Sequence, residues 1–283
     1  MAVAAHRLAR RPLLAGVFGL PLLAPAGGAR AQGIEPAEAP RRAERWRDLK
    51  AAIFDNRETQ PAGDALTLVA PPRALDAAAV PVSLSLSPET APRARAVHLV
   101  IDENPAPLAA VFRAGPAGDL RALSTRVRVD AYTLMHAVAE LDDGRLLETA
   151  QFVKAAGGCS APVGTDLRAA RERMGRMRLV MPEGPPTGPD RAVPVQVALS
   201  HPNLSGLQID QLSRLSIPAE FVRTLRVLYR GAEVLTVEAD ISIAENPTFG
   251  FAFAGEAGGE LRVEAEDSRE RRFATAWTLG NSG

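Results

Sequence analysis

The single cysteine of the chain, Cys159, is the residue whose type and setting most strongly indicate chemistry. Gly157 and Gly158 precede it, and Ser-Ala-Pro follows at residues 160–162. Paired glycines give the backbone wide freedom, so we expect a flexible, exposed tip with Cys159 on it. An accessible thiolate can accept or donate groups by exchange at sulfur. We therefore predict that Cys159 is a covalent attachment site and that Gly157 and Gly158 supply its mobility; the alternative is a buried, inert thiol.

The N-terminus has the pattern of an export signal. Arg7, Arg10 and Arg11 precede an apolar stretch over residues 13–24, and Ala29-Arg30-Ala31 places small residues before a cleavage point at Gln32. We therefore expect residues 1–31 to be a signal peptide for periplasmic export, by the general secretory route or, given Arg10-Arg11, the twin-arginine route. An uncleaved anchor is the alternative, which the prolines and glycines in this stretch disfavour.

Export would change the net charge of the mature chain and the redox environment of its cysteine. Removal of residues 1–31 leaves 29 basic and 33 acidic residues, a net charge of −4. A mildly acidic chain gives no electrostatic reason to bind nucleic acid or an anionic membrane. In an oxidising compartment an unpaired cysteine indicates either a free reactive thiol or a disulfide to a second chain. We thus expect a monomer or a Cys159-linked dimer.

Two other chemistries were considered for Cys159. A catalytic thiol needs a histidine base, but His98, His136 and His201 have no motif spacing that links them to it, so we do not expect an enzyme. Soft ligands from Cys159 with Met174, Met177 and Met181 would suit monovalent copper. Methionines at such spacing are more often a packing stripe, so we predict no metal site and no cofactor.

The rest of the chain predicts an all-β protein. After a flexible stretch over residues 32–42, a helix presents Trp46, Leu49 and Ile53 on one face, which suits a domain cap. Short stretches with period-two alternation, broken by turn residues, then run to residue 153 and again from residue 193 to about residue 279. The pattern predicts two immunoglobulin-like β-sandwiches in tandem, joined by a cysteine-bearing linker.

Several ordered motifs carry a resemblance to a known family. In the first half they are Val80-Pro81-Val82, Asn104-Pro105-Ala106-Pro107 followed by Phe112, Thr125-Arg126-Val127-Arg128, Asp143-Gly144 and Gly157-Gly158-Cys159. In the second half they are His201-Pro202, Ser205-Gly206, Ile217-Pro218-Ala219-Glu220-Phe221 and Glu245-Asn246-Pro247 with Phe249 and Phe251. The first set resembles SoxY and the second SoxZ, the halves of the periplasmic sulfur-oxidation carrier. Their fusion resembles the SoxYZ-like carriers associated with quinoprotein dehydrogenases.

This resemblance implies a division of the chain and a function. We expect an N-terminal extension and capping helix over residues 32–60, a SoxY-like sandwich over 61–160, a linker over 161–189 and a SoxZ-like sandwich over 190–283. The family implies that Cys159 holds a sulfur intermediate on a swinging arm and presents it to sulfur-oxidation enzymes or cytochromes. Here the chain continues past Ser160, so the arm is a tethered loop. The alternative is a docking protein for a periplasmic quinoprotein (PQQ) dehydrogenase or its cytochrome.

Overall fold

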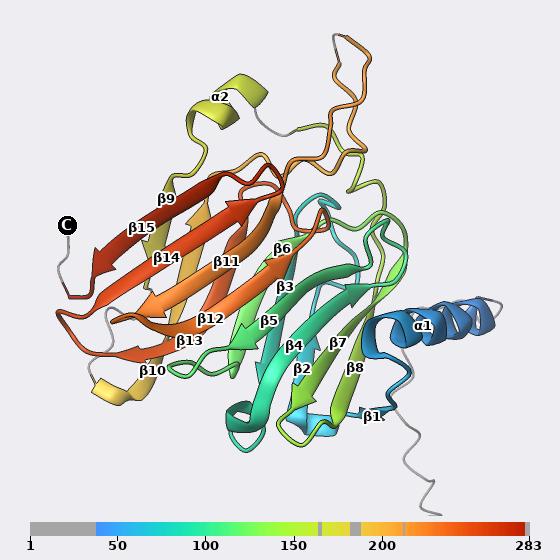
Figure 1. Cartoon of the computed structure of the whole chain (residues 1–283). Helices are drawn as coiled ribbons and strands as arrows, with labels where there is room; N and C mark the ends of the chain where they lie inside the picture. Colours follow the sequence, from blue (N-terminus) through green and yellow to red (C-terminus); the bar gives the residue numbers. More distant parts are fainter. Residues whose placement is uncertain (1–37, 164–165, 182–187, 212, 281–283) are drawn as a thin grey trace, which may run out of the picture. The chain divides into compact units, whose positions relative to one another are not determined.

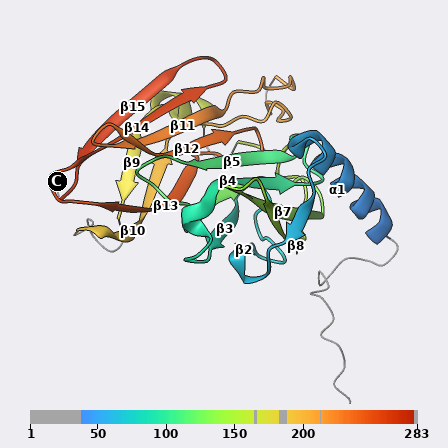
Figure 2. The same cartoon turned by 60° about the horizontal axis from the view of Figure 1, so that its bottom comes forward.

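Two β-sheets form the body of the protein. The computed structural model describes residues 38–163, 166–181, 188–211 and 213–280, so the predicted signal peptide lies outside the described residues. Figure 1 shows the strands, and Figure 2 shows the two sheets as two layers. This arrangement confirms the predicted all-β, sandwich-type fold class.

The larger sheet has nine strands in the order β1-β8-β7-β4-β5-β12-β11-β14-β15. Their bounds are β1 Thr59–Pro61, β4 Ala94–Ile101, β5 Leu108–Ala114, β7 Thr133–Leu141, β8 Leu146–Val153, β11 Val222–Tyr229, β12 Ala232–Ala239, β14 Glu260–Asp267 and β15 Arg272–Thr278. All pairings in it are antiparallel except β1 with β8.

The smaller sheet has six strands in the order β2-β3-β6-β13-β10-β9. Their bounds are β2 Leu66–Val69, β3 Val80–Leu86, β6 Ala122–Val127, β9 Met177–Val180, β10 Gly188–Leu199 and β13 Thr248–Gly255. In β3 the side chains alternate strictly between buried and exposed, as the period-two sequence predicts. Residues 161–189, expected as a linker, contain β9 and the short helix α2, Leu167–Glu172.

Both sheets run across the junction of the two halves. In the larger sheet β5 pairs with β12, with Phe112 opposite Val237, and in the smaller sheet β6 pairs with β13. Between the sheets, the rings of Phe112 and Phe249 meet edge to face with centroids 6.3 Å apart. One apolar cluster holds buried side chains from both halves. The two sandwiches thus share their sheets and a core.

The helix α1, Ala39–Phe54, covers the outer face of the larger sheet near β7 and β8 (Figure 1). Trp46 and Phe54 are buried there against Val100, Val138 and Leu146, as expected for a capping helix. The helix begins before residue 42, so the expected flexible stretch over 32–42 is wrong for its last residues. Pro40 at the start of the helix explains this, because its fixed backbone angle favours the first turn. Within the described residues, no helix has the length and apolarity needed to cross a bilayer.

Candidate functional site

Cys159 lies beyond the end of β8 and is fully buried, with a free thiol. The expectation of an exposed tip is therefore wrong for this conformation. The segment is closed onto the turn after β6: the amides of Gly157 and Gly158 donate to the carbonyls of Asp130 and Val129, at 2.8 and 2.9 Å. The backbone around the thiol is thus hydrogen-bonded into the body of the protein.

Each of the two glycines meets a local geometric need in the closed segment, and their role in flexibility stays a prediction. Gly157 has a backbone angle φ of +79°, which residues with a Cβ rarely adopt. A Cβ on Gly158 would lie 2.0 Å from the carbonyl oxygen of Ala77, so only glycine fits there. The Gly-Gly pair therefore lets the segment dock closely.

A loop of the second half closes over Cys159. The hydroxyl of Ser205 donates a hydrogen bond to the carbonyl oxygen of Cys159. The side-chain oxygen of Gln208, itself buried, accepts from the amide of Ser205 at 2.9 Å and fixes the turn that presents the hydroxyl. The backbone of Cys159, at the end of the first half, is therefore hydrogen-bonded to the second half. The loop projects from the sheets in Figure 1. Its side chains Leu207, Ile209 and Leu215 are exposed.

Two charged residues, Arg128 and Asp130, act electrostatically on the thiol. They flank Val129 in the sequence. Asn104, almost fully buried, positions both: its amide nitrogen donates to the carbonyl of Arg128 at 2.8 Å, and its oxygen accepts from the amide of Asp130 at 2.9 Å. Burial, and to a smaller extent the negative charge of Asp130, raises the pKa of the Cys159 thiol to about 12, while the guanidinium of Arg128 acts against that rise. The closed thiol is therefore protonated and poorly nucleophilic at neutral pH.

The histidines form no catalytic arrangement with Cys159 among the described residues. His136 lies between the carboxylates of Asp102 and Glu148, at 3.3 and 3.1 Å, and Trp46 stacks on its ring. Burial opposes its charge, but those two carboxylates outweigh burial and raise its pKa. His136 thus anchors the capping helix.

The other two histidines are also buried structural residues. Burial lowers the pKa of His98 to about 4, although Glu140 lies 3.7 Å from it. The pKa of His201 is lowered, again chiefly by burial, against the opposing contact of 3.3 Å with Asp267. Neither residue is placed to act as a base for the thiol.

Two of the three methionines considered for copper pack against apolar side chains. Met177 and Met181 are partly buried against the main core, as a packing stripe would be. Among the described residues, no group of three or more histidine, cysteine, aspartate or glutamate side chains is placed to hold a metal ion.

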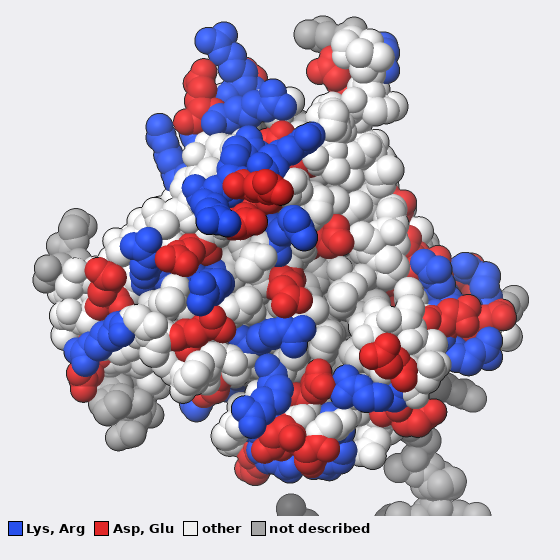
Figure 3. Space-filling view, viewed as in Figure 1, with Lys and Arg blue, Asp and Glu red and all other residues white. Residues whose placement is uncertain are grey.

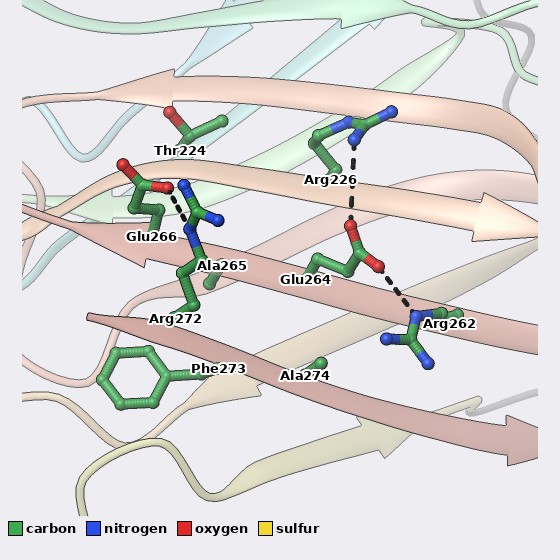
Figure 4. Close-up of a pocket in the computed structure, with 9 residues that line it drawn as sticks. All are labelled: Thr224, Arg226, Arg262, Glu264, Ala265, Glu266, Arg272, Phe273 and Ala274. Carbon is green, nitrogen blue, oxygen red and sulfur yellow. Dashed lines mark hydrogen bonds and ion pairs between the residues drawn. The ribbon is translucent and has the colours of Figure 1, made fainter. Parts of the chain in front are cut away.

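A pocket of about 590 Å³ lies on the open face of β11, β14 and β15, away from the thiol's partners. Figure 4 shows its charged side chains already paired: Glu264 with Arg226 and Arg262, and Glu266 with Arg272. The same face carries interleaved charges of both signs in Figure 3. Exposed pairs of this kind contribute little to binding or stability, and we interpret this face as a solvated surface.

Sequence reasoning found Cys159 but not the groups that surround it. Arg128 and Ser205 belong to motifs that already stood out in the sequence, and Asn104 begins a third. Their common position around one thiol depends on strand pairing between the halves, which no local pattern encodes.

Comparison with family models divides the chain into two matched segments. Residues 50–159 match the model of the sulfur oxidation protein SoxY, and residues 185–278 match that of the sulphur oxidation protein SoxZ. The first match ends on Cys159 itself. No curated protein matches the chain.

Solved structures give further similarities. The sulfur carrier protein SoxY from Chlorobium limicola f thiosulfatophilum is 25% identical over 42% of this chain and 98% of its own, with a TM-score of 0.36. A beta-glycosidase from Bacteroides vulgatus is 9% identical over 76% of this chain and 24% of its own, with a TM-score of 0.21. A glycosyl hydrolase family 2 member from Bacteroides cellulosilyticus DSM 14838 is 11% identical over 75% of this chain and 28% of its own, with a TM-score of 0.21. The chain thus spans about a quarter of the length of these two hydrolases.

Proposed function

We propose that this chain, a SoxYZ-like protein with SoxY and SoxZ family domains in tandem, is a periplasmic carrier that holds a sulfur intermediate covalently on Cys159. The observation that carries the proposal is that the SoxY match ends on Gly157-Gly158-Cys159, the one thiol of the chain. A carrier needs a nucleophilic sulfur and a partner that loads and unloads it, but no active site of its own. We accordingly propose that the chain is not an enzyme and that sulfur-oxidation enzymes or cytochromes visit it.

Because the thiol is buried, the segment that carries Cys159 must open before the thiol reacts. A thiol with a pKa of about 12 has almost no thiolate at neutral pH, whereas an exposed cysteine has several per cent. Release of the Ser205 hydrogen bond and of the two glycine amides would expose the segment and restore an ordinary thiol. In this proposal the closed state protects the cysteine, and its cargo, between visits of the partner. It also keeps a Cys159-linked dimer from forming until the segment opens.

Mass spectrometry and a substitution test the carrier function. The protein isolated from the periplasm of cells that oxidise sulfur compounds should carry sulfur adducts on Cys159. Cys159→Ser should abolish sulfur oxidation that depends on this chain, while Ser160→Ala, at an exposed neighbour, should leave it intact. The same cell fractions test export, since the mature chain should begin at Gln32 in the periplasm. A thiol that stays unmodified in cells, together with full activity of Cys159→Ser, would contradict the proposal.

The second candidate is a docking protein for a periplasmic quinoprotein (PQQ) dehydrogenase or its cytochrome. The observation that favours it is the burial of the thiol, since a protein that never uses Cys159 chemically could keep it closed. In that case Cys159→Ser would leave the activity of the dehydrogenase unchanged. Co-purification of the dehydrogenase with both the native chain and Cys159→Ser would support this candidate over the carrier.

A further inference from the structure

The outer face of the smaller sheet is almost free of charged side chains. Among the described side chains of its six strands, Arg126 on β6 and Arg178 on β9 are the charged ones. The outward positions of β3, β6 and β13 carry mostly serine, alanine and glycine. The outer face of the larger sheet, by contrast, carries interleaved charges of both signs (Figure 3). Depletion of charge is typical of the core of a protein–protein interface, so the smaller sheet offers the better surface for a partner.

Two adjoining pockets form a groove on this face, over the junction of the two halves. Their volumes are about 440 and 350 Å³, and both are lined by Ser83, Ser124 and Gln196. Gly250, from the second half, lies opposite Ser124 on one neighbouring strand and opposite Gln196 on the other. Because Gly250 has no side chain, the groove stays open between them. The side chains of Ser83, Ser124 and Gln196 form no hydrogen bond with other described residues, so their donors and acceptors are available to a ligand.

Strand register places the two arginines in one row across the groove, and both line the larger of the two pockets. Ala198 pairs with Thr248 on one side and with Arg178 on the other. Arg126 lies on the strand beyond Thr248, and its guanidinium donates to the Thr248 hydroxyl at 3.3 Å. Three strand spacings, about 14 Å, therefore separate the backbones of the arginines, with only small side chains between them. The two long side chains can converge over Thr248 and Ala198 on neighbouring acidic groups.

Neither arginine has an acidic partner among the described residues. Arg126 donates to one backbone carbonyl and to the Thr248 hydroxyl, and Arg178, which is exposed, forms no hydrogen bond there. The acidic residues Asp76 and Glu245 line a different pocket, which Arg126 also borders, and neither of them lines the groove. The groove thus has two positive charges and no negative charge among its lining residues.

We propose that this groove is a docking site for an extended, acidic segment of a partner protein. Carboxylates of the segment pair with Arg126 and Arg178, whose planar guanidiniums suit bidentate contact with carboxylate oxygens. The main chain of the segment lies over Gly250, where the missing side chain allows close approach. The hydroxyl of Ser124 and the amide of Gln196 are placed to bond its peptide groups. Such docking would be independent of the proposed carrier function.

The lining favours a peptide over a sugar, a nucleobase or a free anion. Phe251 is the only aromatic residue among those that line the groove, and its side chain is 3% exposed, so no ring is available for stacking. A free inorganic anion would meet only exposed arginines, which hold a single charge weakly in water. An extended segment adds neutral hydrogen bonds along the groove to its ion pairs, and both contribute to binding.

Two pools of fluorescently labelled eight-residue peptides test this on the full mature chain. One pool has aspartate fixed at two positions separated by one residue, and the other has asparagine there. The remaining positions are random mixtures of glycine, serine, alanine and threonine. We expect the aspartate pool to bind about tenfold more tightly in fluorescence anisotropy, because it forms two exposed ion pairs. Raising the salt from about 20 to about 200 mM should reduce this preference, since exposed charges are screened.

Substitutions on the two faces locate the binding site. Arg126→Gln combined with Arg178→Gln should lower the preference to less than about twofold. The matched control combines Arg226→Gln and Arg262→Gln on the outer face of the larger sheet, changes the net charge equally, and should keep the preference. Ala198→Glu places a carboxylate between the two arginines and should abolish binding of the aspartate pool. Ala198→Gln, which has the same size without the charge, should retain most of it.

Three results would overturn the proposal in favour of no docking or of another ligand. The first is equal affinity of the native chain for the two pools, or a preference that survives removal of both arginines. The second is competition by inorganic sulfate at a concentration equal to that of the aspartate pool, since the groove would then bind any small anion. The third is a native dimer in sedimentation equilibrium that the double arginine variant abolishes, which would assign the groove to a second copy of the chain.

The test remains decisive if a variant fails to fold. Arg126 and Arg178 are both exposed, so their replacement should leave the fold intact. If it does not, the comparison of Ala198→Glu with Ala198→Gln decides whether the aspartate pool binds between the arginines. Cys159→Ser should bind the aspartate pool as the native chain does, so the docking proposal and the carrier proposal fail by different results.

Discussion

The hydroxyl of Ser205 donates a hydrogen bond to the carbonyl oxygen of Cys159, and this contact joins the second half of the chain to the end of the first. Both residues are buried, so the hydrogen bond lies within the body of the protein. The half that matches SoxZ thus supplies a side chain that is hydrogen-bonded to the backbone of Cys159. The two residues lie 46 positions apart in sequence.

Loss of the Ser205 hydroxyl should make the thiol more reactive. A net hydrogen bond contributes about 1 kcal/mol, so Ser205→Ala should raise the open population about fivefold. The rate of Cys159 alkylation by iodoacetamide at pH 7.5, under conditions where opening is rapid, should rise by the same factor. Ser85→Ala, at an exposed position on β3, is the control and should not change the rate. Equal rates for Ser205→Ala and the native chain would mean that another contact limits opening.

Gly158→Ala should displace the segment around Cys159. The added Cβ would lie 2.0 Å from the Ala77 carbonyl oxygen, a distance that requires backbone movement. We expect alkylation of Cys159 to accelerate more than tenfold, since the glycine amides must leave their partners. Gly144→Ala tests backbone strain alone, because φ is +83° there and nothing lies within 4 Å of the new Cβ. That variant should lose about 1 kcal/mol of stability and keep a slowly reacting thiol.

The buried thiol should make stability fall at alkaline pH. Its pKa is about 12 in the folded protein and near 9.0 when exposed, so between these values the unfolded chain has lost a proton that the folded chain retains. The free energy of unfolding therefore decreases as pH rises from 9 toward 12, by up to about 1.4 kcal/mol per pH unit from this group. The measurement is the difference in urea unfolding between the native chain and Cys159→Ala across that range. A constant difference would show that the thiol is already accessible in the folded state.

The shared sheets should make the two halves unfold together. The chain has two tryptophans, Trp46 in the first half and Trp277 in the second. The single variant Trp277→Phe therefore reports on the first half by fluorescence, and the single variant Trp46→Phe reports on the second. Phe112→Ala removes the ring that contacts Phe249 and should lower the free energy of unfolding by about 3–5 kcal/mol. We expect the fluorescence transitions of both tryptophan variants in urea to shift together. Leu75→Ala, at a fully exposed residue, should shift neither. Two transitions that respond separately would indicate independent domains.

The fold class could be predicted from sequence because strand alternation and turn residues are local signals. Trp46 on the buried face of a capping helix follows from the same kind of pattern. The continuity of the sheets could not be predicted, because the pairing of Phe112 with Val237 depends on contacts between distant strands. The setting of Cys159 was missed for a related reason: the sequence shows that glycines allow freedom, but not that Gly158 sits against a carbonyl.

His98 should destabilise the fold as pH falls below neutrality. Burial lowers its pKa to about 4 from 6.5, because the ring lies under Phe54 and has no hydrogen-bond partner among the described residues. Glu140 favours its charge, while Arg113 and Arg57 oppose it. Between pH 6.5 and 4 the unfolded chain therefore binds more protons than the folded one, and the free energy of unfolding falls with falling pH. The full contribution is on the order of 3 kcal/mol.

Other groups also titrate in this range, and His136, whose pKa is raised, contributes with the opposite sign: its stabilisation is present at low pH and is lost as pH rises. The comparison is therefore between the native chain and His98→Leu, which keeps the apolar contact with Phe54. We expect the stability difference between them to shift steadily in favour of His98→Leu from pH 6.5 to 4, in urea titrations at fixed ionic strength. Parallel stability curves would mean that His98 gains its proton without unfolding, through a rearrangement of the capping helix that frees the ring.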